Sequence, residues 1–355
     1  MSSTVHTPHT EKCDHDRPFI SFLATAYRTE KTLDRTIGSV LAQGRPDWEL
    51  VIVDNGMSDA LAAVVEPHLT DPRVCLLRQE NNGPAGGVMA AAAGARGRYV
   101  AVLNSDDAVT PDFCEVMARR LSSDTSIAAV TCDADLVEEG GRGRLRRTYL
   151  RDAGLRHPPD GDRPLRVAEI IEGPCPYYTA AIRRDVWDAM GGMRTDVPKV
   201  HDLDFWLRTV AAGHDVRMIP DRLCVYYLTQ GSESRPVDPL ESEVFEEQRE
   251  SVLVRAAEST GSREDLEALQ RARRRLYYTQ ALRRARVALL SGDTSLALEE
   301  SRRARRARST WRARILVVGV RVAPSWMARL HPVKQTLQSR LSAPLRRPFP
   351  RGKGR

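Results

Sequence analysis

The residues best suited to chemistry are two adjacent carboxylates, Asp106 and Asp107. They follow the uncharged apolar segment 99–103 after only Asn104 and Ser105, and such a segment is typical of a strand buried on both faces of a parallel sheet. Ligands of open α/β sheets bind beyond the carboxyl ends of the strands. Two carboxylates there suit a hard divalent cation, which in turn suits a diphosphate. The alternative is an ordinary acidic turn before a helix, since Asp and Ser are common turn residues.

Polar side chains also follow the two earlier apolar segments, 19–24 and 48–53. After the first comes Tyr27, whose ring at the end of a strand can stack on a nucleobase. After the second come Asp54 and Asn55, and a side-chain oxygen at this place can accept a hydrogen bond from the imide N–H of a pyrimidine. The alternatives are a tyrosine that only covers the edge of the sheet and a simple Asx turn.

A glycine-rich loop, residues 83–87, stands before a predicted alanine-rich helix. Backbone N–H groups at the start of such a helix can bind phosphate or ribose oxygens, which makes Gly86 a donor-binding candidate. The spacing of the glycines matches neither the phosphate-binding loop nor the dinucleotide-binding motif, so the loop alone identifies no ligand.

Asp202 lies at the start of a predicted helix, residues 201–212. The large apolar residues Phe205, Trp206 and Leu207 can anchor this helix in a core, while Asp202 points into a site. A carboxylate so placed can act as a general base for a hydroxyl nucleophile. The alternative is that Asp202 only caps the helix.

These candidates need a scaffold in which strands alternate with helices. The hydrophobic pattern predicts strands at 19–24, 48–53, 74–77, 99–103 and 127–132, with helices at 31–43, at 60–69 and after the glycine-rich loop. Such alternation indicates βαβ units and a parallel sheet, so the polar ends of the strands would share one edge. Residues 138–164 are expected to form a long mobile insertion. It is followed by predicted helices at 183–190 and 201–212 and predicted strands at 216–219 and 223–228.

Charge is distributed unevenly along the 355 residues, a length that suits about two domains. From residue 240 onward there are 26 Lys and Arg against 12 Asp and Glu, whereas the preceding part has 28 against 35. Nucleic acid suits the basic part poorly, because aromatic residues do not interleave with the charges. A solvated arginine-rich face and an anionic membrane surface both suit it. The membrane is favoured, because Trp311, residues 315–320 and Trp326 alternate with arginines as in an interfacial helix.

The cysteines and the apolar runs indicate a cellular location. None of the six cysteines forms a C-x-x-C pair or has metal-ligand spacing, which predicts reduced, mostly buried thiols in a cytosolic protein. The first residues lack the charged-then-apolar pattern of a signal peptide. The apolar run 315–320 is too short to span a bilayer. We therefore expect a cytoplasmic protein that is peripheral at the inner face of the cell membrane.

The order and spacing of these motifs resemble the family 2 glycosyltransferases, which have the GT-A fold. The resemblance covers residues 18–235 and rests on the segments 20–28, 39–43, 48–59, 95–107, 191–193 and 201–208. It implies an α/β fold class, with a Rossmann-like, mostly parallel central sheet flanked by helices, and here a C-terminal α-helical region follows. The expected domains are a disordered arm at 1–17, the GT-A domain at 18–235, a helical C-terminal region at 236–310 and a basic amphipathic tail, partly disordered, at 311–355.

The resemblance implies an enzyme that transfers a hexosyl or deoxyhexosyl group from a nucleoside diphosphate sugar of the UDP or dTDP type. The acceptor would be a hydroxyl of a glycan, a lipid-linked compound or a natural product, as in cell wall or polysaccharide biosynthesis. It would lie over residues 172–178 and the variable loop before them. Thr25, Tyr27 and Asn55 would line the nucleobase, with Asp54 beside them.

The resemblance also assigns the reacting groups. Asp106 would approach the ribose or sugar, and Asp107, supported by Asp106, would hold Mn²⁺ or Mg²⁺ on the diphosphate. Asp202 would be the general base of a single displacement that inverts the anomeric configuration. This agrees with the chemistry, because a cation offsets the charge that builds on the leaving diphosphate.

Four positions depart from the pattern of the family. Asn55 and Asn104 stand where Asp is common, His201 stands where Glu is common, and Thr229 stands near the place of a His. Asn104 can still accept a hydrogen bond at the donor site but brings no charge, which weakens the predicted metal site. These departures keep a second hypothesis open, namely a homologue that binds nucleotide sugars without turnover. A dehydrogenase is disfavoured, because no G-x-G-x-x-G follows the first strand.

Overall fold

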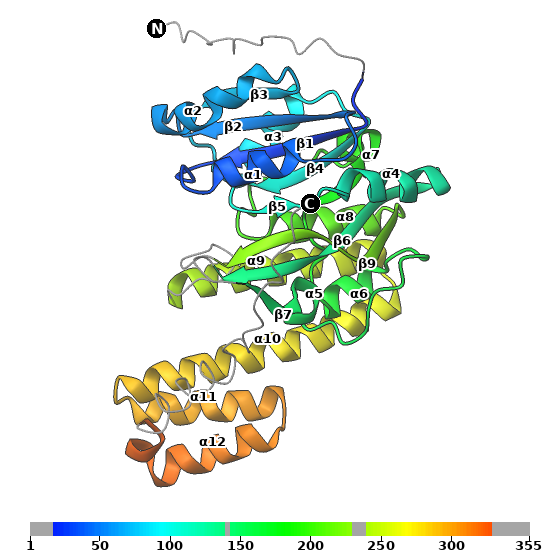
Figure 1. Cartoon of the computed structure of the whole chain (residues 1–355). Helices are drawn as coiled ribbons and strands as arrows, with labels where there is room; N and C mark the ends of the chain where they lie inside the picture. The colour runs from blue at the N-terminus through cyan, green and yellow to red at the C-terminus, as the bar shows by residue number, and fades with distance from the viewer. Residues whose placement is uncertain (1–16, 139–142, 229–238, 329–355) are drawn as a thin grey trace, which may run out of the picture. The chain divides into compact units, whose positions relative to one another are not determined.

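The computed structural model describes residues 17–138, 143–228 and 239–328 (Figure 1). The chain divides into two compact units, Met1–Ser262 and Arg263–Arg355. The predicted arm lies outside the described residues except for Arg17, and so do Thr229 and the last part of the predicted basic tail. Helix α9 (Pro239–Thr260), which the sequence pattern groups with the C-terminal helical region, falls in the first unit.

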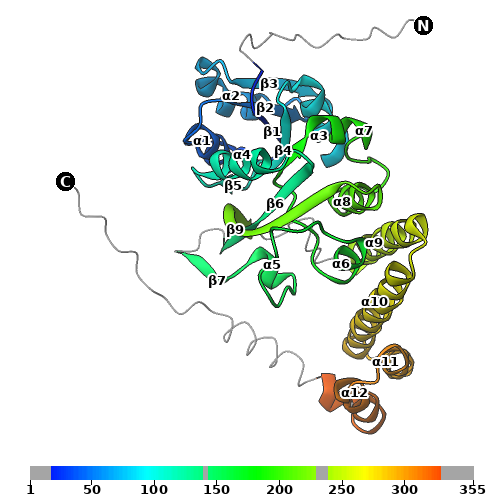
Figure 2. The same cartoon turned by 90° about the vertical axis from the view of Figure 1, so that its right-hand side faces the viewer.

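One sheet runs through the first unit in the strand order β3-β2-β1-β4-β8-β6-β9-β5, with β7 paired to β6. The first four strands of this order are parallel and lie side by side (Figure 2). Strand β8 is antiparallel to both its neighbours, and β6 runs parallel to β9. The strands are β1 (Ile20–Ala26), β2 (Trp48–Asn55), β3 (Val74–Gln79), β4 (Tyr99–Asn104), β5 (Ala108–Val109), β6 (Ile127–Glu138), β7 (Arg144–Thr148), β8 (Ala180–Arg183) and β9 (Asp215–Leu228). Every residue of β2 is buried, which explains the uninterrupted apolar run 50–53 at its centre.

Helices with an apolar side cover this sheet. Leu33, Ile37 and Val40 are the buried apolar residues of α1, at the spacing of one helix face. Trp187 on α7 packs against Phe205 on α8 with the ring centroids 5.0 Å apart, which holds the helix that carries Asp202. Besides α9, the helices of this unit are α1 (Leu33–Leu41), α2 (Asp59–Val65), the 3₁₀ helix η1 (Glu66–Thr70), α3 (Gly83–Gly94), α4 (Phe113–Ser123), α5 (Tyr149–Asp152), α6 (Val167–Glu172), α7 (Arg184–Ala189) and α8 (His201–Ala211).

The region after β6 is more regular than its sequence suggests. Residues 144–152, expected to belong to a mobile insertion, form β7 and α5. The strands expected at 216–219 and 223–228 are a single strand, β9, whose pairing with β6 is irregular around Pro220. Proline has no N–H to donate to a ladder, so the strand tolerates it only at such an irregularity.

Two further expectations are wrong in part. The glycines at 83–87 form the first turns of α3 and are not a loop before it. Cys75 is disulfide-bonded, which contradicts the prediction of a reduced thiol at this position. The free cysteines of the described residues are Cys114, Cys132, Cys175 and Cys224, and all but Cys175 are buried.

The described part of the second unit consists of α10 (Arg263–Leu290), α11 (Thr294–Ala307) and α12 (Trp311–Val322). Asp293 caps α11 by accepting a hydrogen bond from Leu296 N at 2.9 Å, and Thr310 caps α12 in the same way from Ala313 N at 3.1 Å. A small core holds the helices together and consists of Ala288, Leu289, Ala297 and Val320, with Leu298, Leu316 and Met327 against it. Over the described ranges of the chain, no helix has both the length and the apolarity to cross a membrane.

Candidate active site

The register of the parallel strands brings the predicted donor residues to one edge of the sheet. Thr25 on β1 is level with Asn104 on β4, and Ala26 is level with Asp54 on β2. All three strands end here, so the turns that follow them border the same space. The expectation that the polar ends of these strands share one edge is therefore confirmed.

Asp54 carries a buried oxygen that has no hydrogen-bond partner. Its side chain is 1% exposed, and Oδ2 accepts a hydrogen bond from Arg78 Nε at 3.0 Å. Asp54 Oδ1 and Thr25 Oγ1 are both buried and lack a hydrogen-bond partner within the described structure. Such atoms destabilise a fold unless a ligand satisfies them. The ends of β1 and β2 are therefore suited to a polar ligand.

Asn55, in contrast, uses both polar atoms of its side chain in hydrogen bonds within the protein. Its Nδ2 donates to Gly83 O at 2.9 Å and to Asn81 Oδ1 at 3.2 Å. Its Oδ1 accepts from Gln79 Nε2 at 2.7 Å and from Asn82 N at 3.2 Å. These bonds tie the end of β2 to the residues that lead into α3. A nucleobase would have to displace one of them, so the geometry suits Asn55 to holding the loop.

Tyr27 lies at the same edge and is 42% exposed. Its ring packs beside Gly56, where an added Cβ would lie 3.0 Å from it, and the Arg28 guanidinium is 5.0 Å from the ring centroid. Arg28 and Met57 have positive φ angles of 58° and 53°. Strained backbone of this kind gathers at functional sites, and here it follows β1 and β2. The exposed ring is available for stacking.

The glycines of α3 allow this helix to approach β1 closely. An added Cβ on Gly87 would overlap Thr25 Cγ2 of β1, whereas one on Gly86 would lie 2.8 Å from Cγ of Asn82, the N-cap residue of the same helix. Both glycines are buried. Close packing therefore explains why glycine occupies these positions, and a donor contact of Gly86 stays a prediction.

We expect Gly87→Ala to destabilise the first unit by about 1–3 kcal/mol, because the new methyl group overlaps Thr25 and one of the two must move. Gly38→Ala is the matched control, since nothing lies within 4 Å of a Cβ at this position of α1. Alanine there should stabilise the helix by about 0.5–1 kcal/mol. Urea unfolding of the full chain measures both changes. Equal unfolding midpoints for the two variants would contradict the tight fit at Gly87.

Asp107 is buried among tyrosines. Its Oδ2 accepts hydrogen bonds from the hydroxyl of Tyr178 and, at 3.5 Å, from that of Tyr177, while Oδ1 accepts one from Tyr227 N at 2.9 Å. Burial, together with the nearby charge of Asp106, raises the pKa of Asp107 well above its usual value. Because both oxygens are engaged within the protein, the position of Asp107 suits a structural role in the turn.

The other two polar side chains of this turn are more accessible, since Asn104 is exposed and Asp106 is half-buried. Arg35 on α1 holds the turn in place. It donates to Asp106 O at 2.7 Å, and its guanidinium lies 3.4 Å from the ring centroid of Tyr227. Sequence reasoning missed Arg35 and the tyrosines around Asp107. The sequence feature that could have indicated these contacts is the pair of adjacent tyrosines at 177–178 and again at 226–227.

A continuous set of contacts links Asp107 to Asp202. The ring of Tyr177 packs on that of Tyr149 with the centroids 4.9 Å apart. The Tyr149 hydroxyl donates to Cys175 O at 3.4 Å, and Cys175 Sγ donates to Asp202 Oδ2 at 3.8 Å. The turn after β4 and the start of α8 therefore border one region.

Asp202 is half-buried in the first turn of α8. Val200 occupies the N-cap position of this helix, and Asp202 Oδ1 accepts a hydrogen bond from Leu203 N at 2.8 Å. The second acidic residue of the same turn, Asp204, is buried and paired with Arg208 at 2.7 Å. Of these two carboxylates, Asp202 is the more accessible.

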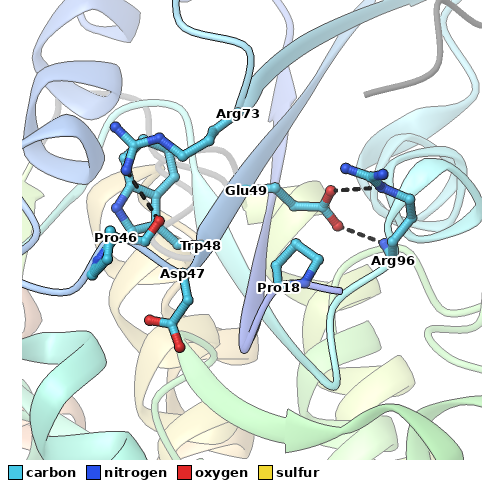
Figure 3. Close-up of a pocket in the computed structure, with 7 residues that line it drawn as sticks. All are labelled: Pro18, Pro46, Asp47, Trp48, Glu49, Arg73 and Arg96. Carbon is cyan, nitrogen blue, oxygen red and sulfur yellow. Dashed lines mark hydrogen bonds and ion pairs between the residues drawn. The ribbon is translucent and has the colours of Figure 1, made fainter. Parts of the chain in front are cut away.

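A separate cavity of about 90 Å³ lies at the opposite end of β2 (Figure 3). Glu49 is paired there with Arg96 at 3.3 Å, and Arg73 donates to Pro46 O at 3.1 Å. The lining consists of Pro18, Pro46, Asp47, Trp48, Glu49, Arg73 and Arg96. Because the cavity lies at the amino end of the strand, it is distinct from the edge that carries Asp54.

The chain resembles known proteins in both sequence and fold. Residues 21–191 match the model of the family described as glycosyl transferase family 2. Over 127 residues the chain is 40% identical to the succinoglycan biosynthesis protein ExoO of Rhizobium meliloti (strain 1021). That segment covers 35% of this chain and 36% of ExoO, so the chain spans about a third of this relative's length.

Two solved structures resemble the chain in fold. S. aureus TarS 1-349 in complex with UDP-GlcNAc gives a TM-score of 0.55 at 15% identity, over 82% of this chain and 91% of that one. The mannosyltransferase PcManGT from Pyrobaculum calidifontis, in complex with GDP-Man and Mn²⁺, gives a TM-score of 0.54 at 17% identity, over 92% of this chain and 85% of that one.

The fold and the polar edge of the sheet thus define a protein of the GT-A class, and the predicted fold class is confirmed. The match of residues 21–191 to the model of glycosyl transferase family 2 confirms the resemblance that the sequence motifs indicate. The family match ends before α8, so it does not reach Asp202.

Proposed function

We propose that the protein is an inverting glycosyltransferase, which moves a sugar from a nucleoside diphosphate sugar to a hydroxyl group. The main support for this proposal is the edge of the sheet formed by the ends of β1, β2 and β4. At this edge the buried Oδ1 of Asp54, which has no hydrogen-bond partner, lies level with the turn that contains Asp106. The match of residues 21–191 to the family 2 model supports this activity. The titles of the TarS and PcManGT structures name bound UDP-GlcNAc and GDP-Man, which are donors of this class.

The donor is proposed to carry uracil or thymine. The imide N–H of either base can donate to Asp54 Oδ1, which would satisfy the buried oxygen. The exposed ring of Tyr27 would stack on the base, and Thr25 Oγ1 would gain a hydrogen-bond partner from the nucleoside. We assign Asn55 to the support of this pocket, because its amide already makes four hydrogen bonds with its own chain.

A divalent cation, Mn²⁺ or Mg²⁺, fits the turn after β4 if the diphosphate completes its ligands. Within the described residues no three His, Cys, Asp or Glu side chains gather as a ligand set. A cation shared with substrate phosphates needs only one or two carboxylates, however. The half-buried Asp106 suits this role, with the amide oxygen of Asn104 beside it, whereas the buried Asp107 would keep the turn in shape. When bound, the cation would offset the charge that develops on the leaving diphosphate.

Asp202 is proposed to be the general base. Its carboxylate would take the proton of the acceptor hydroxyl, and the hydroxyl oxygen would attack the anomeric carbon from the side opposite the diphosphate. One displacement of this kind inverts the configuration. The hydrogen bonds from Leu203 N and Cys175 Sγ would hold the carboxylate in place.

The acceptor is proposed to be a glycan, a lipid-linked compound or a natural product that lies over residues 172–178. The name of ExoO assigns that relative to succinoglycan biosynthesis, and a role in polysaccharide or cell wall biosynthesis is proposed here by analogy. We also propose a cytoplasmic location, peripheral at the inner face of the cell membrane.

A thermal-shift screen of the full chain with UDP, dTDP and GDP and their sugars, each with and without Mn²⁺, tests the donor site. UDP or dTDP should raise the melting temperature, since a ligand at a hundred times its Kd stabilises by about 2.7 kcal/mol. A larger shift with GDP would contradict the pyrimidine assignment. Release of nucleoside diphosphate from the best donor then tests turnover. Binding with no transfer and no hydrolysis under any condition would favour the non-catalytic homologue.

A further inference from the structure

Helix α12 carries an apolar stripe that faces away from the core of the second unit. Its members, Trp311, Ile315, Val318 and Val322, are between 56% and 76% exposed and form what we call the α12 stripe. Their spacing of four, three and four residues places them on one face of the helix. The opposite face carries the residues that are buried or packed against the core, namely Ala313, Leu316 and Val320.

Exposed arginines border the α12 stripe on both sides. With 3.6 residues per turn, Arg312 lies on one side of the stripe, and Arg314 and Arg321 lie on the other. All three are exposed. Residues 301–355 contain 16 Lys and Arg and no Asp or Glu. An exposed apolar stripe thus lies in a strongly positive segment that contains no acidic residue of its own.

We propose that the α12 stripe docks on an anionic lipid surface, with the helix lying in the plane of the headgroups. The apolar side chains would enter the boundary with the acyl chains, and the bordering arginines would meet lipid phosphates. Trp326, just beyond α12 and 68% exposed, is of a type enriched at this boundary.

A second copy of this chain suits the stripe less well than lipid does. Two stripes face to face would bring two sets of arginines together with no carboxylate between them, and such like-charge contacts are unfavourable. The lipid surface is therefore the occupant that matches both the apolar face and its charge. Lipid binding by the α12 stripe involves the second unit only, so it does not depend on the proposed glycosyl transfer.

Tryptophan fluorescence of the full chain gives a direct test. Of the five tryptophans, Trp48, Trp187 and Trp206 are each 1% exposed, so Trp311 and Trp326 are the ones that can respond to lipid. Vesicles of phosphatidylglycerol and phosphatidylcholine in equal parts should shift the emission to the blue and sediment the protein. Vesicles of phosphatidylcholine alone should bind at least about tenfold more weakly, because the arginines then lose their partners. Absence of binding to the anionic vesicles overturns the proposal.

Matched variants assign the binding to the stripe. Ile315→Ser combined with Val318→Ser should weaken binding to anionic vesicles by about tenfold or more. The control combines Val287→Ser with Leu290→Ser, which removes two apolar side chains that are 47% and 55% exposed on α10, and should bind like the parent. Circular dichroism checks that both variants are folded. Equal binding of the two variants, or a soluble dimer that only the stripe variant disrupts, would overturn the lipid assignment.

Discussion

Replacing Asp202 by asparagine should lower kcat for sugar transfer by about 10²–10⁴-fold, the usual contribution of a positioned general base. The amide keeps the size of the side chain and can still accept the hydrogen bond from Leu203 N, so the start of α8 should stay in place. Donor affinity should change little, because Asp202 is proposed to act on the acceptor hydroxyl. Release of nucleoside diphosphate measures kcat, and calorimetric titration with the intact donor measures affinity.

The matched control for Asp202→Asn is Asp196→Asn. Asp196 is an exposed carboxylate shortly before α8 that pairs with Arg194, so its loss should leave both kcat and donor affinity close to those of the parent. A role of Asp202 in folding alone would appear as a lower melting temperature with kcat preserved in the folded fraction. Near-parental turnover in the folded Asp202→Asn variant would rule out this residue as the base.

Replacement of Asp106 and replacement of Asp107 by asparagine should have different effects on activity and stability. Asp106→Asn should lower kcat/KM by about 10²–10³-fold, comparable to the loss of one group that stabilises the transition state. Its melting temperature should change little, because the side chain is half-buried at the edge of the site. Asp107→Asn should instead destabilise the fold by about 1–3 kcal/mol, since the amide cannot accept from both tyrosine hydroxyls and Tyr227 N as the carboxylate does.

Nucleotide binding with and without Mn²⁺ separates these two roles. In the parent, Mn²⁺ should strengthen the binding of UDP, and in Asp106→Asn most of this gain should be lost. Asp107→Asn, measured well below its melting temperature, should keep the gain. The reverse pattern, with the gain lost only in Asp107→Asn, would show that Asp107 holds the cation after all.

The sheet and its polar edge could be predicted from sequence because they depend on local patterns. The segments 50–53 and 99–103 are continuous apolar runs, which is typical of a strand that is covered on both faces. Asp54 directly follows the first run and Asp106 follows the second after two polar residues, so both fall at the edge where parallel strands end. The region before β8 could not be predicted in the same way, because the short elements β7 and α5 carry little periodicity of their own. Strand β7 depends on its pairing with β6.

By itself, the sequence determined the fold class, the resemblance to family 2 and the edge of the sheet that carries Asp54 and Asp106. Only the tertiary structure decided what each side chain does there. The partners of Asn55 come from residues 79–83, and those of Asp107 lie 70 to 120 positions further along the chain, so no local pattern could show that both side chains are occupied. The same holds for α12. Its amphipathic spacing is readable in the sequence, but which side is buried depends on contacts with α10 and α11, and those contacts leave the α12 stripe exposed.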